Sequence, residues 1–325
     1  MKTIPAWLTA TLLSLGTLPA MAQTGLRIEG LLDLGLNASR TPGASTTERS
    51  LSSGLLGNSH LALSGAEDLG GGLGLRFRLA TDLRADTGAA ARSESDALWS
   101  RSAALGLRHT RYGSLDLGRL PTALWLSTQR FNALGESLAY SPSARHWFTT
   151  VTGDTDWNQA LHYQSPSLGG WRLGLAAATR TGNGGNWSAQ ADYAGGPFSA
   201  ALVLQQVKKD TSSASVADSR AVQLGAAWDF GRAQAFAQWG QVQNLTTTLD
   251  HSIGGLGLRV PLASGHLVAQ WSRYAPELGL ERDTAAAGYV HTLSRRTQLY
   301  GLVLSDRVQG LSGGGGLAVG LRHSF

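Results

Sequence analysis

Pairs of charged residues at alternate positions are the part of this sequence that could do chemistry. Arg76 and Arg78 are two residues apart, and the residues beside them, such as Phe77, are apolar. An extended strand places alternate side chains on opposite faces, so both guanidinium groups point the same way. An arginine in the middle of a bilayer costs about 2–4 kcal/mol, so this face must contact water.

A second segment, residues 26–37, repeats the pattern with charges of both signs. Arg27, Glu29 and Asp33 share one face, and the opposite face is mostly Ile and Leu. Charges of both signs on a wet face can attract, repel or orient ions at short range. The chemistry that these residues indicate is therefore electrostatic.

Nothing in the sequence indicates catalysis or a bound cofactor. The eight histidines are scattered, and the zinc-protease pattern His-Glu-x-x-His does not occur. Residues 70–74 are similar to a phosphate-binding loop, but they lack the following Lys and lead into a strand pattern, so a hairpin turn is favoured. We expect no enzyme activity, no cofactor and no metal site.

Alternation of this kind extends through most of the chain. The last nine residues, 317–325, place four apolar residues and His323 on one face and small or polar residues on the other, and the chain stops at Phe325. A closed sheet explains a chain that stops on an apolar strand, because closure removes the edge.

Turn signals between these strands predict the strand count. Seven tight turns rich in Gly, Pro, Ser and Asp alternate with eight longer connections, which together join sixteen strands. Aromatic residues lie beside the turns, as in an interfacial girdle. This organisation predicts an all-β protein, a 16-stranded antiparallel transmembrane β-barrel.

Composition agrees with that prediction. The chain is 42% hydrophobic and its mean hydropathy is −0.09, which a barrel tolerates because only alternate residues face lipid. The 27 basic residues are scattered among 22 acidic ones, so nucleic-acid binding is not expected.

The first residues have the features of an export signal. Lys2 precedes a short apolar run at 8–18, and Ala20-Met21-Ala22 fits a cleavage site. We expect residues 1–22 to be a signal peptide and residues 23–325 to form the barrel. The chain has no Cys, so it does not depend on disulfides in an oxidising compartment.

One connection, about 120–157, is much longer than the others. It shows no sustained alternation and carries aromatic and charged residues together, including the lone His146. Connections beyond about 12–15 residues are usually functional or disordered, and the aromatic content argues against disorder.

Several of these motifs resemble one protein family. The turn G-A-E-D-L-G-G-G-L at 65–73, L-G-R at 117–119, Y-Q-S-P at 163–166, W-D-F-G at 228–231 and the end G-L-R-H-S-F are similar to those of the trimeric general porins of β-proteobacteria. The resemblance covers essentially all of residues 23–325.

The resemblance implies a water-filled pore, a third loop folded into the lumen, and three barrels in a homotrimer. The segment 120–157 matches the position and length of that loop. His60 and Ser64 stand where the family usually has basic residues, and Leu120 follows Arg119 in place of a Gln. The resemblance therefore leaves the ion preference of this chain open.

These observations lead to one hypothesis for the site. Arg76 and Arg78 would line the narrowest part of the pore, opposite Glu136, which is the one carboxylate between residues 120 and 151. Arg27, Asp33 and His60 would also line the pore. The alternative is that the arginines lie higher or lower on the wall, or pair with neighbouring carboxylates. Arg119 would line the constriction or anchor the base of the loop.

The predicted function is an outer-membrane porin for passive diffusion of ions and small hydrophilic solutes, with outer-membrane lipid as its surroundings. A substrate-specific channel and a non-conducting structural or adhesive surface barrel are the alternatives. Saturable conductance would distinguish the first of these. The sequence contains no plug domain and no extended passenger, which favours the open channel.

Overall fold

The computed structural model describes residues 25–148, 154–179, 185–208, 218–246 and 250–325. The expected signal peptide, residues 1–22, therefore lies outside the described residues. Within the described part of the chain, no helix is both long enough and apolar enough to cross a membrane.

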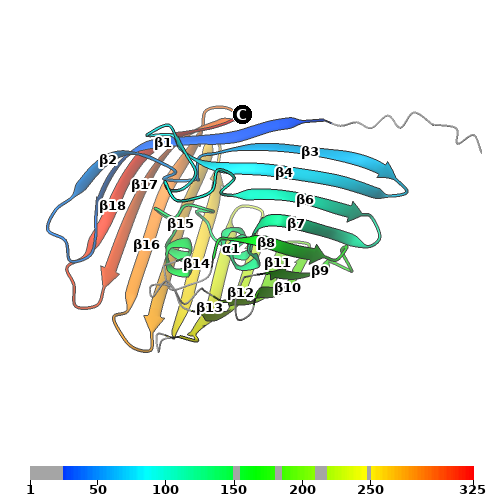
Figure 1. The fold of residues 1–325 in the computed structure, drawn as a ribbon. Helices are drawn as coiled ribbons and strands as arrows, with labels where there is room; N and C mark the ends of the chain where they lie inside the picture. The colour runs from blue at the N-terminus through cyan, green and yellow to red at the C-terminus, as the bar shows by residue number, and fades with distance from the viewer. Residues whose placement is uncertain (1–24, 149–153, 180–184, 209–217, 247–249) are drawn as a thin grey trace, which may run out of the picture.

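Sixteen antiparallel strands form a closed barrel, as the sequence predicted (Figure 1). They are β1 (Arg27–Arg40), β3 (His60–Gly70), β4 (Leu73–Arg84), β6 (Ser102–His109), β7 (Gly113–Pro121), β8 (Asp156–Gln164), β9 (Trp171–Ala178), β10 (Asn186–Gly195), β11 (Phe198–Val207), β12 (Ser219–Asp229), β13 (Gln234–Asn244), β14 (His251–Leu262), β15 (Gly265–Pro276), β16 (Arg282–Thr292), β17 (Thr297–Val308) and β18 (Gly314–Ser324).

The last residue closes the barrel against the first strand. The backbone N–H of Gly30 donates to the carbonyl of Phe325, and that of Phe325 donates to the carbonyl of Gly30, each at 3.1 Å. A Cβ on Gly30 would lie 2.4 Å from the Phe325 ring, so only glycine leaves room for it. Closure pairs every barrel strand on both sides, which a membrane-spanning sheet requires.

The connections follow the predicted alternation of tight turns and longer loops. The connection between β1 and β3 departs from this because it contains β2 (Glu48–Ser53), which folds back on β1. The 85–101 connection likewise contains the two-residue β5 (Ala89–Ala90) beside β4. β2 pairs with residues 34–39 of β1 and β3 with residues 27–31, so β2 continues the wall next to β3. The short polar sequence of β2 has no alternation strong enough to predict it.

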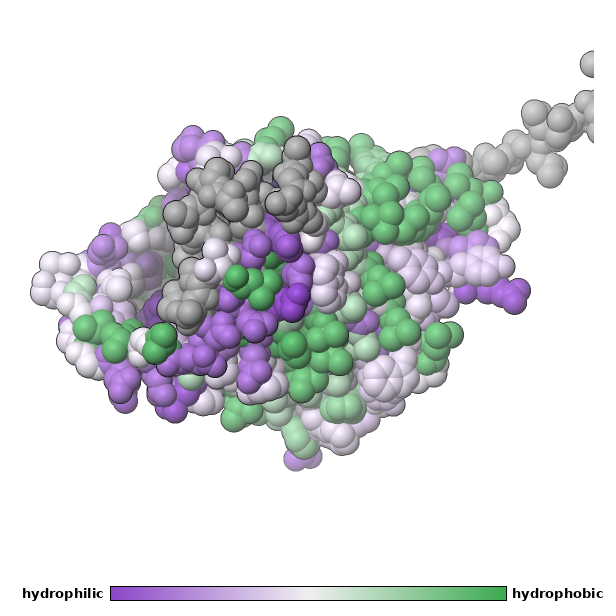
Figure 2. All heavy atoms as spheres, turned by 60° about the horizontal axis from the view of Figure 1, so that its bottom comes forward, coloured by the Kyte–Doolittle hydropathy of each residue, from purple (hydrophilic) through white to green (hydrophobic). Residues whose placement is uncertain are grey.

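The outer face of the barrel is apolar. On β18, Leu317, Val319 and Leu321 are exposed while Ala318 between them is buried, which is the alternation that the sequence predicted. Figure 2 shows apolar side chains over much of one side of the molecule. A continuous exposed apolar face on a barrel wall is the surface that lipid covers.

An aromatic row runs across the turn end of four neighbouring strands, as expected for an interfacial girdle. Its ring centroids follow one another at 5.1 Å (Trp171 and Tyr193), 6.0 Å (Tyr193 and Phe198) and 5.9 Å (Phe198 and Trp228). Trp and Tyr are favoured where an apolar surface meets water, because their rings are amphipathic.

The long connection between β7 and β8 folds into the barrel and forms two short helices, α1 (Ala123–Arg130) and α2 (Pro142–Trp147) (Figure 1). Thr122 caps α1 by accepting a hydrogen bond from the N–H of Trp125. Ser141 caps α2, and Pro142 occupies its first turn. These side chains satisfy N–H groups that would otherwise lack partners at the helix ends.

The two helices pack against one side of the barrel interior. Contacts of α1 are with β10, β11 and β12, and those of α2 are with β14, β15 and β16. Trp147 is fully buried beside Gly240, where a Cβ would lie 2.5 Å from the indole. The loop therefore rests on the β10–β16 wall, and the lumen remains open along the opposite wall.

Candidate functional site

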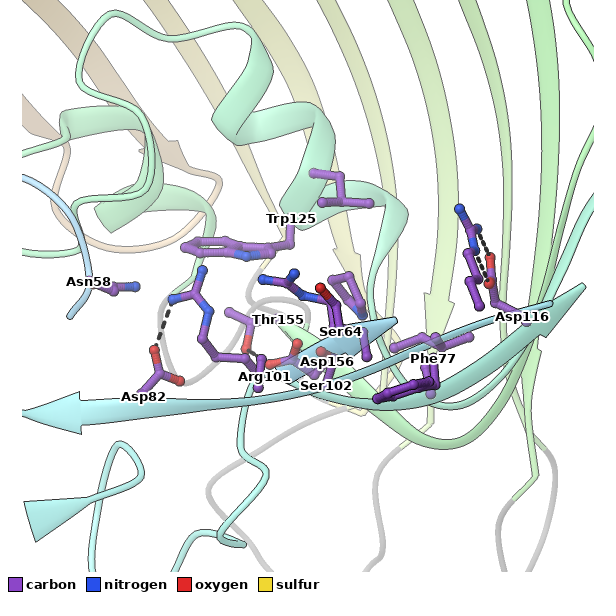
Figure 3. Close-up of a pocket in the computed structure, with 18 of the residues that line it drawn as sticks. Asn58, Ser64, Phe77, Asp82, Arg101, Ser102, Asp116, Trp125, Thr155 and Asp156 are labelled. Carbon is purple, nitrogen blue, oxygen red and sulfur yellow. Dashed lines mark hydrogen bonds and ion pairs between the residues drawn. The ribbon is translucent and has the colours of Figure 1, made fainter. Parts of the chain in front are cut away.

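The open part of the lumen is a cavity of about 880 Å³ between α1 and the opposite wall. Strands β3, β4, β6 and β7 supply the wall, and Trp125, Leu126 and Gln129 of α1 supply the other side. In Figure 3, Trp125 and Arg101 point into this space from opposite sides. The cavity therefore lies between the charged wall and the loop.

Arg76 and Arg78 both line the cavity, and each is paired with a carboxylate two strands away, Asp116 on β7 and Glu29 on β1. Arg76 donates to both oxygens of Asp116, with its Nε 2.9 Å from Oδ1. Arg78 donates to Glu29 across the wall. Arg76 is 47% exposed and covers Asp116, which is 13% exposed. Arg78 and Glu29 are exposed to the same degree, at 43% and 44%. The first pair therefore presents mainly a guanidinium group to the water, and the second presents charges of both signs.

Glu136 lies opposite a different arginine from the two that the sequence suggested. Its Oε2 accepts a hydrogen bond of 2.6 Å from Arg101, which also donates to Asp82 at 2.9 Å. Burial alone would lower the pKa of Arg101, but Glu136 and Asp82 outweigh it and hold that pKa above its usual value. Arg101 stays charged and ties the loop to the wall.

Sequence reasoning did not single out Arg101. It precedes β6 directly and so falls outside the alternating pattern that identified the other arginines. Only the fold brings Arg101 next to a residue that is 35 positions away in the chain.

Arg119 lies at the base of the loop and is largely covered, with 13% of its side chain exposed. It donates to the carbonyl of Ser100 at 2.7 Å and to Asn158 at 2.6 Å. Arg92, from the β4–β6 connection, joins this group by donating to Asp96 at 2.8 Å. Contacts of this kind are expected of a residue that anchors the base of the loop, which is one of the two roles that the sequence suggested for Arg119.

Asp33 is fully buried, although the sequence suggested a place on the pore surface. It accepts hydrogen bonds from the backbone N–H groups of Leu56 (3.0 Å) and Gly57 (2.7 Å) and from the hydroxyl of Tyr300. Its carboxylate thus fixes the 55–57 segment to the inner wall. The 54–59 segment and Tyr300 cover it, which a strand pattern alone does not reveal.

Arg27 and His60 complete the set of predicted residues. Arg27 lines the cavity, and among the described residues its guanidinium forms no ion pair. His60 begins β3, and its Nδ1 lies 2.8 Å from the carbonyl oxygen of Asn58. Asn58 lines the cavity but His60 does not, so His60 lies at the margin of the cavity.

Among the described residues, no His, Asp and Glu side chains form a group of three or more that could hold a metal ion. A Gly-x-Ser-x-Gly pattern does occur at 310–314, but it connects β17 to β18. A nucleophile elbow lies between a strand and a helix, so this Ser is part of an ordinary loop.

Comparison with known proteins places these features in context. Residues 9–310 match the profile of a family described as Gram-negative porin. The chain is similar to outer membrane porin protein 32 of Delftia acidovorans, with 28% identity over 94% of this chain and 95% of the relative. It is also 26% identical to an outer membrane porin protein of Bordetella pertussis, over 86% of this chain and 88% of that protein.

Solved structures show the same fold. An anion-selective porin from Comamonas acidovorans superposes with a TM-score of 0.79 at 24% identity, over 93% of this chain and all of the other. OmpF from Salmonella typhi, in complex with daunomycin, gives a TM-score of 0.71 at 12% identity, over 92% and 97% of the two chains.

Proposed function

This chain belongs to the Gram-negative porin family, and from that premise we propose that the cavity between α1 and the arginine-bearing wall is the narrowest part of its channel. The channel crosses the outer membrane and carries ions and small hydrophilic solutes by passive diffusion. Arg27, Arg76 and Arg78 line that narrow part from the wall.

The observation that carries this proposal is the placement of the long loop. It occupies the lumen, yet it packs on β10–β16 and leaves the facing wall in contact with a cavity of about 880 Å³. Selectivity in a channel is set where the pore is narrow and charges are close to the ion. The wall arginines meet both conditions.

We propose a weak preference for anions. Asp116 and Asp82 are largely covered by Arg76 and Arg101, whereas Glu29 is as exposed as its partner Arg78. Because most arginines are paired, the field at the pore centre is much smaller than that of the same arginines unpaired. Arg27 supplies the positive charge that the described carboxylates do not balance.

Single-channel recording in a planar bilayer under a salt gradient tests this function. Large ohmic steps with a reversal potential on the anion side are expected. Steps that saturate with the concentration of one solute would favour a substrate-specific channel instead. Absence of steps from folded, inserted protein would favour a non-conducting surface barrel and overturn the proposal.

Two further proposals accompany the channel. We propose a homotrimer, on the family likeness. Conductance steps in groups of three and the mass of the detergent-solubilised complex test it.

We propose cleavage after Ala22, because the Ala20-Met21-Ala22 sequence fits a signal peptidase site. The mass of the exported protein tests that cleavage; a mass that includes residues 1–22 would contradict it.

A further inference from the structure

The loop presents an apolar surface to the pore. Leu126 and Leu138 are 45% and 39% exposed, and both line the cavity. Within residues 122–148 they are the large aliphatic side chains that remain exposed, because the others are buried against the wall or in the loop's own core. Leucine side chains in contact with lumen water raise the free energy of the empty pore.

Between residues 122 and 148 no carboxylate lines the cavity beside these leucines, and Asp156 at the start of β8 lines it but is covered beside Arg92. The one acidic residue in 122–148 is Glu136, and its carboxylate is engaged by Arg101. A pore that filtered solutes by an electric field across it would need an acidic loop opposite a basic wall. Here an apolar loop faces the basic wall instead.

The basic wall carries a row of three polar groups at one level. Arg27 on β1 is the register partner of Ser64 on β3, and Ser64 is the partner of Arg78 on β4. All three line the cavity, and Figure 3 shows Ser64 pointing into it. Register partners in an antiparallel sheet lie about 4.5–5.5 Å apart, so one carboxylate can approach all three.

Two of these groups keep hydrogen-bond donors available. Arg27 forms no ion pair among the described residues. Arg78 donates through Nη1 to Glu29, and its side chain is still 43% exposed. A guanidinium has five N–H donors, so Arg78 can hold Glu29 and also bind a passing anion.

We propose that this narrow part favours amphipathic organic anions, that is, small carboxylates with an aliphatic or aromatic body. The carboxylate is held by Arg27, Ser64 and Arg78 while the apolar body lies against Leu126 and Leu138. This inference rests on the proposed channel function and names the class of solute that the channel prefers. A hydrophilic anion of similar charge gains only the first of the two contacts.

Reversal potentials under bi-ionic conditions test the proposal at neutral pH. Sodium benzoate and sodium gluconate are each measured against sodium chloride, with the wild-type channel and with Leu126→Ser/Leu138→Ser. The double variant should lower the benzoate-to-gluconate permeability ratio by about threefold, because it removes the apolar contact. Permeability to chloride relative to gluconate should not change.

Leu98→Ser is the matched control. Leu98 is 58% exposed in the β4–β6 connection and does not line the cavity, so it should leave the ratio unchanged. A second variant, Arg27→Gln, keeps both leucines and should reduce the permeability of benzoate and gluconate alike. It keeps the proposal testable if the serine variant fails to fold.

The outcomes separate this inference from the channel function itself. A conducting channel whose benzoate-to-gluconate ratio does not respond to the leucine substitutions overturns the inference alone. The same holds if those substitutions raise the permeability of every ion equally, since the leucines would then only narrow the pore. A folded protein that conducts no chloride overturns the proposed function, and the inference with it.

Discussion

Glu136 of the long loop and Arg101 of the facing wall form an ion pair of 2.6 Å. This pair joins two parts of the lumen that are otherwise separated by the cavity. It also neutralises the acidic residue that would have opposed the arginine wall. The pair therefore affects both the position of the loop and the charge that faces the pore.

Substitution Glu136→Gln should increase anion preference. Arg101 would keep Asp82 but lose its loop partner, so part of its positive charge would be exposed to the cavity. Loss of one partner of a partly buried pair should also lower the free energy of unfolding, by about 1–3 kcal/mol. The reversal potential under a salt gradient and the unfolding temperature in detergent measure the two effects.

Glu94→Gln is the control, because Glu94 is 88% exposed where it pairs with Arg84. An unchanged reversal potential for Glu136→Gln would mean that Arg101 does not contribute to the field in the pore.

Substitution Arg27→Gln should shift the reversal potential towards zero. Arg27 lines the cavity without an ion pair among the described residues, so its charge acts on ions directly. Arg119→Gln should leave the reversal potential nearly unchanged and lower stability instead, because Arg119 is covered and bonded to Ser100 and Asn158. If the two variants had the opposite effects, our assignment of pore and anchor would be reversed.

Substitution Asp33→Asn should weaken the fold with little effect on conductance. The carboxylate accepts from Leu56, Gly57 and Tyr300, and an amide cannot accept all three equally well. Loss of a buried acceptor of this kind costs about 1–3 kcal/mol. The rate of proteolysis in the 55–57 segment and the unfolding temperature are compared between wild type and variant. Asp68→Asn, in an exposed turn, is the control.

A large change in ion selectivity for Asp33→Asn, with an unaltered unfolding temperature, would contradict the burial of Asp33.

Substitution Gly30→Val should prevent closure of the barrel. Its first side-chain carbon would overlap the ring of Phe325, the residue whose backbone exchanges two hydrogen bonds with Gly30. Gly254→Ala is the control, since a Cβ there meets no atom within 4 Å. Gel mobility with and without heating separates folded from unfolded barrels, and a normally folded Gly30→Val protein would rule out this close packing.

Protonation of His146 at acid pH should weaken the packing of the long loop against the barrel wall. Its ring nitrogens each lie 3.0 Å from a hydroxyl, of Ser272 and of Thr284, and burial lowers the pKa of His146 from 6.5 to about 3. The unfolded chain therefore binds the proton more readily than the folded one. Stability falls as the pH drops from about 6.5 towards 3, by up to about 1.4 kcal/mol for each unit of pH.

His146→Gln should reduce that pH dependence while other titrations remain. The charged groups that face His146 are Arg145 on its own helix and Arg282, Asp283 and Asp306 on the wall. The unfolding temperature is compared between wild type and variant over this pH range. Equal slopes for the two proteins would show that a group other than His146 controls the effect.

The sequence alone determined the barrel. Alternation of apolar and polar residues, as on 73–84 and 317–325, fixes which face of each strand contacts lipid, because the side-chain period of a strand is two. Turn residues then set the strand count, and residue motifs indicated the family and the long third loop. These are local signals, and the structure confirmed sixteen strands and the loop inside them.

Only the tertiary structure decided which charges meet. Arg101 and Glu136 are 35 residues apart, and Asp33 and Tyr300 are 267 residues apart, so no spacing in the sequence pairs them. Alternation identifies a face that avoids lipid, but it does not separate a residue in the pore from one beneath the loop. Arg27 and Asp33 share a face of β1, yet the 54–59 segment covers Asp33 and leaves Arg27 in contact with the cavity, because burial depends on where the connections pack.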